Sequence, residues 1–164
     1  KDHVGDFCVS GRYTTPSPGL SIQGLGIVPL PILPNIIHQN KQSAPENSIS
    51  QVCGMEFDSS MVSVLNPVWD DTLKTLMLRV SDSLGLKRSN VECSLHKVIL
   101  DDVGDCRRVL EHEANHIGTL EIQLPSVFKG GSHIVRHDEM ESVFAMGADD
   151  SSCKYDTWFL ARFA

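Results

Sequence analysis

Hydrophobic residues recur at helical spacing over one stretch of the chain, Pro67 to Leu84. The apolar side chains that share one face at 3.6 residues per turn are Trp69, Leu73, Leu76, Met77, Val80 and Leu84. Asn66 is placed to cap the first amides, and Gly85 can leave the helix in the left-handed conformation. The pattern predicts a helix over residues 67–84 that packs on a sheet.

Most of the remaining apolar residues follow the spacing of strands. In the second half the predicted strands are residues 91–100, 117–124, 133–137, 142–146 and 155–163. Earlier, Leu20 and Ile22 predict a short strand before the proline-punctuated run 28–34, and a short helix is expected from Asn35. Short strands are also expected around residues 52–57 and 61–65. A helix followed by a run of strands predicts an α+β, mainly β domain.

Residues 1–18 differ from the rest, because they mix Gly, Ser, Thr and Pro with single apolar residues. Such a segment is expected to be a flexible N-terminal arm. Residues 19–164 then form a single domain, since a chain of 164 residues with 41% hydrophobic residues can bury one sizeable core.

Composition excludes several classes of partner. The net charge of −7 disfavours nucleic acid, because no basic face can be assembled against phosphates. No membrane insertion is expected, since prolines and a glycine interrupt the longest apolar stretch, residues 25–37. Five cysteines without a C-x-x-C pair favour free thiols over disulfides or a zinc knuckle. Together with the absence of a signal-peptide pattern, they favour a cytoplasmic or nuclear location.

Several sequence blocks occur in the order seen in one enzyme family. The most specific block runs from Gly118 to Pro125, a Gly-Thr-Leu strand that ends in Leu-Pro, and Gly130-Gly131 follows it. The other blocks are residues 18–22, 66–69, 95–100, 135–137 and 158–164. The chain therefore resembles the first part of an iron- and 2-oxoglutarate-dependent oxygenase domain of the prolyl 4-hydroxylase type. The resemblance implies a helix-supported double-stranded β-helix (jelly-roll), here incomplete at its C-terminal side.

The iron site that the resemblance implies is not intact in the sequence. The family holds Fe(II) on two histidines and one carboxylate, of which the first two come from a His-x-Asp or His-x-Glu triplet just before the Gly-Thr-Leu strand. Residues 104–117 contain no such triplet, and His137-Asp138-Glu139 lies one strand too late. We therefore expect a non-catalytic relative that does not bind Fe(II) or 2-oxoglutarate.

Such a relative is expected to serve as a binding or scaffold module. The segment 155–163 is expected to present an unpaired strand edge, which a protein partner or missing C-terminal strands would cover.

An alternative reading starts from the string His112-Glu113-Ala114-Asn115-His116. On a helix, H-E-x-x-H places two imidazoles one turn apart, with the glutamate as general base for a zinc-bound water. His112, His116 and Glu113 would then be the metal-site residues of a zinc-dependent hydrolase. Because Gly118 opens a strand directly afterwards, such a helix would be only about ten residues long.

Overall fold

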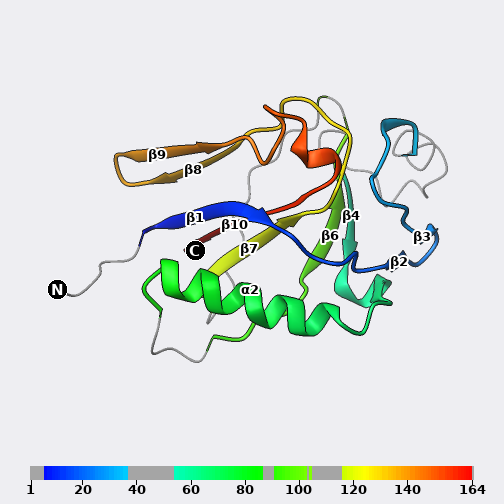
Figure 1. Ribbon diagram of the computed structural model, residues 1–164, viewed down its shortest axis with the longest axis horizontal. Helices are drawn as coiled ribbons and strands as arrows, with labels where there is room; N and C mark the ends of the chain where they lie inside the picture. The colour runs from blue at the N-terminus through cyan, green and yellow to red at the C-terminus, as the bar shows by residue number, and fades with distance from the viewer. Residues whose placement is uncertain (1–5, 37–53, 87–90, 103, 105–115, 164) are drawn as a thin grey trace.

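The computed structural model describes residues 6–36, 54–86, 91–102, 104 and 116–163. Within these residues the chain is mainly β, with several small antiparallel sheets and one long helix (Figure 1). None of the helices in this part of the chain is both long and apolar enough to cross a membrane. The predicted mainly β class with a supporting helix is confirmed.

The largest described sheet has the strand order β1-β10-β7, and its neighbouring strands run antiparallel. Its strands are β1 (Cys8–Tyr13), β7 (Gly118–Gln123) and β10 (Thr157–Phe163). β10 is the central strand, so the expectation that residues 155–163 form an unpaired edge is wrong. The reason is β1, which pairs with β10 along its whole length.

The expected flexible arm over residues 1–18 is accordingly wrong for Cys8–Tyr13, which forms β1. The strand is hard to recognise in the sequence because both of its faces bury side chains, and these side chains differ in kind. Val9 and Tyr13 pack with the core on one side of the sheet, while Cys8 is buried on the other side. Its partner strand lies about 150 residues away, so no local pattern of alternating strands and turns marks it.

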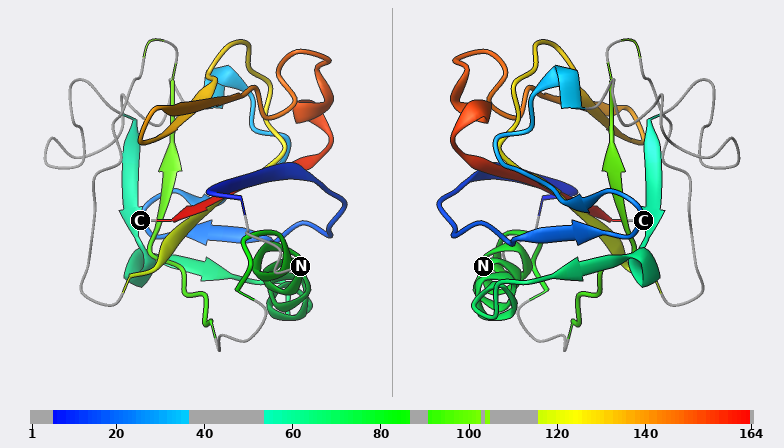
Figure 2. Two further views of the ribbon diagram at one scale, coloured as in Figure 1. Left: turned by 90° about the vertical axis from the view of Figure 1, so that its left-hand side faces the viewer. Right: turned by 90° about the vertical axis from the view of Figure 1, so that its right-hand side faces the viewer.

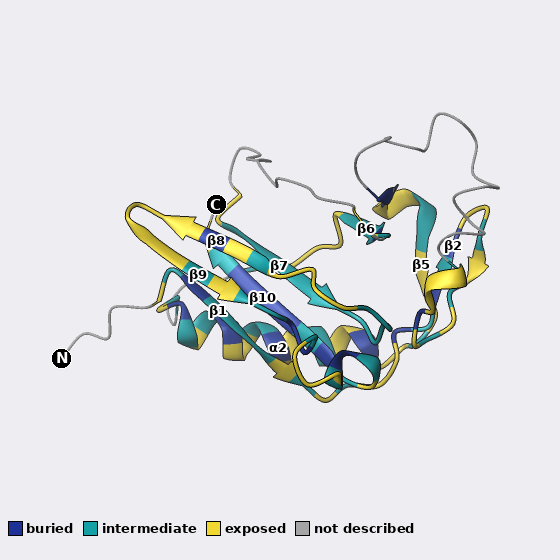
Figure 3. Cartoon of the chain, turned by 90° about the horizontal axis from the view of Figure 1, so that it is seen from above, coloured by how far each residue is buried: buried dark blue, intermediate teal, exposed yellow. Residues whose placement is uncertain are grey.

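Each face of this sheet is covered by one element, as the end-on views show (Figure 2). Helix α2 (Trp69–Ser83) covers one face, where Leu76 and Val80 pack with Phe159 and Ala161 of β10. On the other face lies a hairpin of β8 (His133–His137) and β9 (Met140–Phe144). There Val135 packs with Leu160 and Met146 of the buried cluster. Because successive side chains of a strand point to opposite faces, β10 contributes to both cores (Figure 3).

Helix α2 confirms the prediction made from periodicity. It spans Trp69–Ser83, and its buried residues Trp69, Leu76 and Val80 belong to the predicted apolar face. Asn66 caps the turn that leads into the helix, because its Oδ1 accepts a hydrogen bond from the Val68 amide at 3.1 Å. At the other end Gly85 has a φ of 77°, and the Leu86 amide bonds back to the Ser81 carbonyl at 2.7 Å.

A second group of short strands surrounds its own core. β2 (Leu20–Ile22) lies between β3 (Gly26–Ile27) and β5 (Val62–Val64), which confirms the strand predicted at Leu20. β4 (Met55–Asp58) pairs with β6 (Lys97–Leu100). The buried residues of this core are Ile22, Ile32, Met55, Phe57 and Leu100.

Two details of this region differ in extent from the prediction. The strand expected over residues 91–100 is limited to its last four residues, β6. The helix expected from Asn35 begins at residue 34, and the described residues follow it only as far as residue 36.

Candidate functional site between the sheet and the hairpin

A cluster of charged side chains lies where the hairpin meets the sheet. Glu121 of β7 and Arg162 of β10 project from the same face, because Arg162 is opposite Thr119 in the register, two residues from Glu121. Arg162 Nη1 donates a hydrogen bond to Glu121 Oε1. His133 of β8 approaches from the hairpin, with its Nδ1 3.1 Å from Glu121 Oε2. Three strands thus bring one carboxylate, one guanidinium and one imidazole together.

The carboxylate of Glu121 is held in its ionised form. Burial alone would raise its pKa, but hydrogen bonds from His133 and Arg162, with their positive charges, lower the pKa from the ordinary 4.5 to about 2. Both carboxylate oxygens already have partners. A carboxylate in this state is a poor proton acceptor near neutral pH, and we interpret it as a structural link between hairpin and sheet.

Cys8 extends the cluster toward the edge of the sheet. It lies opposite Arg162 in the β1–β10 register and is 8% exposed. Burial raises the pKa of the Cys8 thiol, and a hydrogen bond with Ser142 of β9 opposes this only in part. The thiol is therefore protonated at neutral pH, which argues against a role as a nucleophile.

The residues of the predicted zinc motif are only partly described. His112 and Glu113 lie outside the described residues. His116 is exposed and belongs to neither a helix nor a strand, and two residues later β7 begins. The zinc site at His112, Glu113 and His116 therefore stays a prediction.

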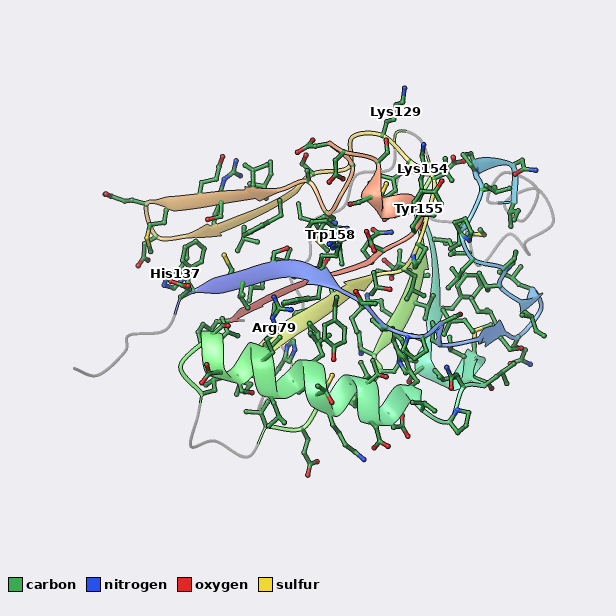
Figure 4. All side chains as sticks on the ribbon, viewed as in Figure 1. Arg79, Lys129, His137, Lys154, Tyr155 and Trp158 are labelled. Atoms are coloured by element: carbon green, nitrogen blue, oxygen red, sulfur yellow. The ribbon has the colours of Figure 1, made fainter. Side chains whose placement is uncertain are left out.

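The triplet His137-Asp138-Glu139 forms the tip of the β8–β9 hairpin. Asp138 adopts a φ of 52° in the turn, and its side chain is 85% exposed. The His137 ring stacks on Phe7 with its centroid 5.6 Å away and an interplanar angle of 17° (Figure 4). Asp138 thus serves the turn, and His137 packs against Phe7.

The described residues include only part of the region in which the family resemblance implies an iron site. Nowhere among them do three or more His, Cys, Asp or Glu side chains gather as metal ligands would. Glu121 and His133 would provide one carboxylate and one imidazole, but Arg162 places a positive charge directly on that carboxylate. Most of the interval in which the resemblance places the first two ligands, residues 104–117, lies outside the described residues.

A second buried feature lies in the turn that follows β9. Gly147 has a φ of 80°, and a Cβ atom there would clash with the indole of Trp158 and with Ser152 Oγ. The Trp158 Nε1 and Ser152 Oγ atoms are both buried, and neither has a hydrogen-bond partner among the described residues. Trp158 also packs on the core beneath the hairpin (Figure 4).

Sequence reasoning missed the Glu121 cluster, although a signal was present. Glu121 and Arg162 are charged residues inside strands, at positions that alternate with the core residues Ile122 and Ala161. Both charges therefore lie on the face of the sheet opposite the core residues, and they need partners if another element covers that face. The covering hairpin could not be foreseen.

Comparisons were made with family models, with curated proteins and with solved structures. None of them matches this chain. The resemblance to prolyl hydroxylases therefore rests on the sequence blocks alone.

Proposed function

We propose that this chain is a relative of the 2-oxoglutarate- and iron-dependent protein prolyl hydroxylases that works as a protein-binding module rather than as a catalyst. Two kinds of observation support the proposal. One concerns the order of the strands in space, and the other concerns the chemistry of the face between sheet and hairpin.

The order of four consecutive strands is that expected of a jelly-roll. β7 and β10 lie side by side, while β8 and β9, which separate them in the sequence, form the hairpin over one face of their sheet (Figure 1). In jelly-rolls the chain leaves one sheet for the facing sheet and then returns beside the strand it left, as in a Greek key. Since the Gly-Thr-Leu block forms β7, the motif order and the topology support the same fold.

The observation that carries the non-catalytic part of the proposal is the pairing of Glu121. The face of β7 that looks toward the hairpin is where a jelly-roll enzyme would place its reactive groups. In this chain the Glu121 carboxylate on that face is paired with Arg162 and His133, which lower its pKa. The buried side chains Leu160 and Val135 belong to the core between sheet and hairpin. Such a face holds two layers together and offers no free proton acceptor.

The experiment is a comparison of melting temperatures under anaerobic conditions with Fe(II) plus 2-oxoglutarate, with zinc, and with chelator. A ligand that binds only the folded state, at a hundred times its Kd, stabilises that state by about 2.7 kcal/mol. We expect no increase with Fe(II) plus 2-oxoglutarate. An increase, together with one iron per chain in metal analysis, would overturn the proposal.

The same experiment separates the zinc-hydrolase alternative. If zinc raises the melting temperature, the effect should be lost in His112→Ala and in His116→Ala. It should persist in His137→Ala, a control that removes a histidine at the hairpin tip, outside the motif. That pattern would favour the zinc site over the binding module.

A further inference from the structure

The hydrogen bonds of the central sheet reveal which backbone groups of β7 are directed away from it. The Phe163 amide bonds to the Phe7 carbonyl at 3.4 Å, so these two residues form a hydrogen-bonded pair between β10 and the start of β1. In an antiparallel ladder bonded and non-bonded pairs alternate, and the N–H and C=O of one residue point the same way. The odd-numbered residues of β10 therefore bond to β1, and the even-numbered ones bond to β7.

The same alternation assigns the two edges of β7. Leu160 and Arg162 bond to their opposite residues, Glu121 and Thr119. The backbone N–H and C=O groups of Leu120 and Ile122 consequently point outward, to the side of β7 that faces away from β10.

In the part of the chain that the structure describes, nothing pairs with this outer side. β7 ends the strand order of its sheet, and no described residue bonds to the outward groups of Leu120 or Ile122. Four strong hydrogen-bonding groups are thus presented in a row, as at an exposed sheet edge. The bonded length of β7 is six residues, long enough to pair with another strand.

The opposite edge of the sheet, along β1, is different because α2 is tied to it. Arg79 Nη1 donates to the Arg12 carbonyl at 3.4 Å, and the Asp6 amide donates to the Ser83 carbonyl at 3.4 Å. Arg79 also lies over the Phe159 ring, 5.2 Å from its centroid (Figure 4). These contacts occupy part of the β1 edge, whereas β7 has no equivalent among the described contacts.

The chemistry on the two faces of β7 defines what would fit beside it. Leu120 and Ile122 pack with the core under α2, so a neighbouring strand would need apolar side chains on that face. On the hairpin face the neighbours are polar, namely Thr119, Glu121 and Gln123. A matching strand therefore has an apolar residue at every second position, with polar residues between them.

Charge favours a different protein over a second copy of this chain as the source of that strand. The chain carries 21 acidic and 14 basic residues, so two copies would repel each other. An acidic side chain opposite Glu121 would add a like charge on the same face. A segment with neutral or basic polar positions, from a different protein, is the better complement.

We infer that the outer edge of β7 binds an extended segment of a partner protein, about six residues long, with alternating apolar and neutral or basic residues. The segment adds a strand to the sheet, and its main chain bonds to Leu120 and Ile122. The inference rests on the proposed binding function and names its surface and the class of its partner.

The test follows amide hydrogen exchange in the chain while a probe peptide is added. The probe is an eight-residue peptide in which valine alternates with threonine or lysine, and its control has the same composition with the valines grouped at one end. In the free protein, the amides of Thr119 and Glu121 should exchange slowly and those of Leu120 and Ile122 rapidly. The alternating peptide should slow exchange at Leu120 and Ile122 at least tenfold, and the control peptide should not.

One modified probe and two variants of the protein make the test specific for the edge. A probe peptide with N-methylated amides on its bonding side should bind on the order of tenfold or more weakly, because it cannot donate those hydrogen bonds. Ile122→Pro removes an outward N–H without touching the ladder to β10, and it should abolish protection by the probe. Ser10→Pro, the matched change at the outer edge of β1, should leave probe binding intact.

Several results would overturn the inference. These are slow exchange at Leu120 and Ile122 without peptide, protection that grows with protein concentration alone, and equal affinity for the N-methylated probe. The N-methylated probe keeps the test decisive if Ile122→Pro does not fold. Since the proposed lack of catalysis is tested by metal and 2-oxoglutarate binding, a negative peptide result would leave that part standing.

Discussion

Glu121 and Arg162 form a diagonal ion pair across the β7–β10 ladder, on the face of the sheet that the β8–β9 hairpin covers. Their side chains are 28% and 17% exposed, so both charges are largely removed from water. His133 adds a contact from the hairpin to the same carboxylate. One carboxylate thereby connects three strands from two layers.

The lowered pKa of Glu121 predicts a loss of stability in acid. Because its pKa is about 2 in the folded state and ordinarily 4.5, its contribution is complete above pH 4.5 and is lost as the pH falls toward 2. The shift corresponds to roughly 3 kcal/mol of unfolding free energy. Urea unfolding across this range should show the loss in the wild type and a flatter profile in Glu121→Gln. Glu139→Gln, at the exposed hairpin tip, is the control and should keep the wild-type profile.

Arg162 and Arg136 offer a matched comparison of a covered and an exposed ion pair. Arg162→Ala leaves the covered Glu121 carboxylate with His133 as its remaining partner, which should lower the unfolding free energy by about 3 kcal/mol. Arg136 pairs with Glu141 at 2.6 Å, but its side chain is 72% exposed. Arg136→Ala should therefore change stability by less than about 1 kcal/mol. Equal losses in the two variants would show that Glu121 is better solvated than its burial indicates.

Gly147 should tolerate no side chain. Gly147→Ala forces a Cβ into the Trp158 indole and Ser152, and it also strains a backbone with a φ of 80°. We expect a loss of more than about 2 kcal/mol, with a shift in tryptophan fluorescence. Gly130 has a similar φ of 73° but nothing within 4 Å of the Cβ position, so Gly130→Ala isolates the backbone cost. That cost should be about 1 kcal/mol.

The described cysteines should differ in their rate of alkylation according to their solvent exposure. Cys8 and Cys153 are buried and Cys93 is exposed, and all three are free thiols. Alkylation of the native protein, followed by peptide mass spectrometry, should therefore modify Cys93 before Cys8 and Cys153. Fast modification of Cys8 would mean that the hairpin opens readily from the sheet, and it would weaken the structural role assigned to the Glu121 link.

The sequence predicts those helices and strands that are defined by the spacing of residues close together in the chain. The apolar face from Trp69 to Leu84 depends only on helical periodicity, and α2 lies within a few residues of the predicted range. The alternation of Leu120 and Ile122 likewise predicts β7 to within one residue at each end. In both cases the spacing of the apolar side chains that face the core is itself the periodicity of the helix or strand.

What the sequence could not predict depends on distant partners. β1 forms because β10 lies beside it, and its own residues carry no regular alternation. The Glu121 site needs β7, β8 and β10 at once, so its members look like isolated charges in the linear sequence. Conversely, the string from His112 to His116 is conspicuous locally, but its first members lie outside the described residues.

The pairing of β1 with β10 has a consequence for synthesis of the protein. Ser10 Oγ bonds to the Phe159 carbonyl at 2.8 Å across a separation of 149 residues, so the centre of the sheet cannot form until Thr157–Phe163 has left the ribosome. Until then, β1 and β7 lack the strand that lies between them, and the apolar face of α2 lacks its buried partners Phe159 and Ala161. The nascent chain should consequently depend on holding chaperones throughout elongation, and it should commit to its sheet in one late step.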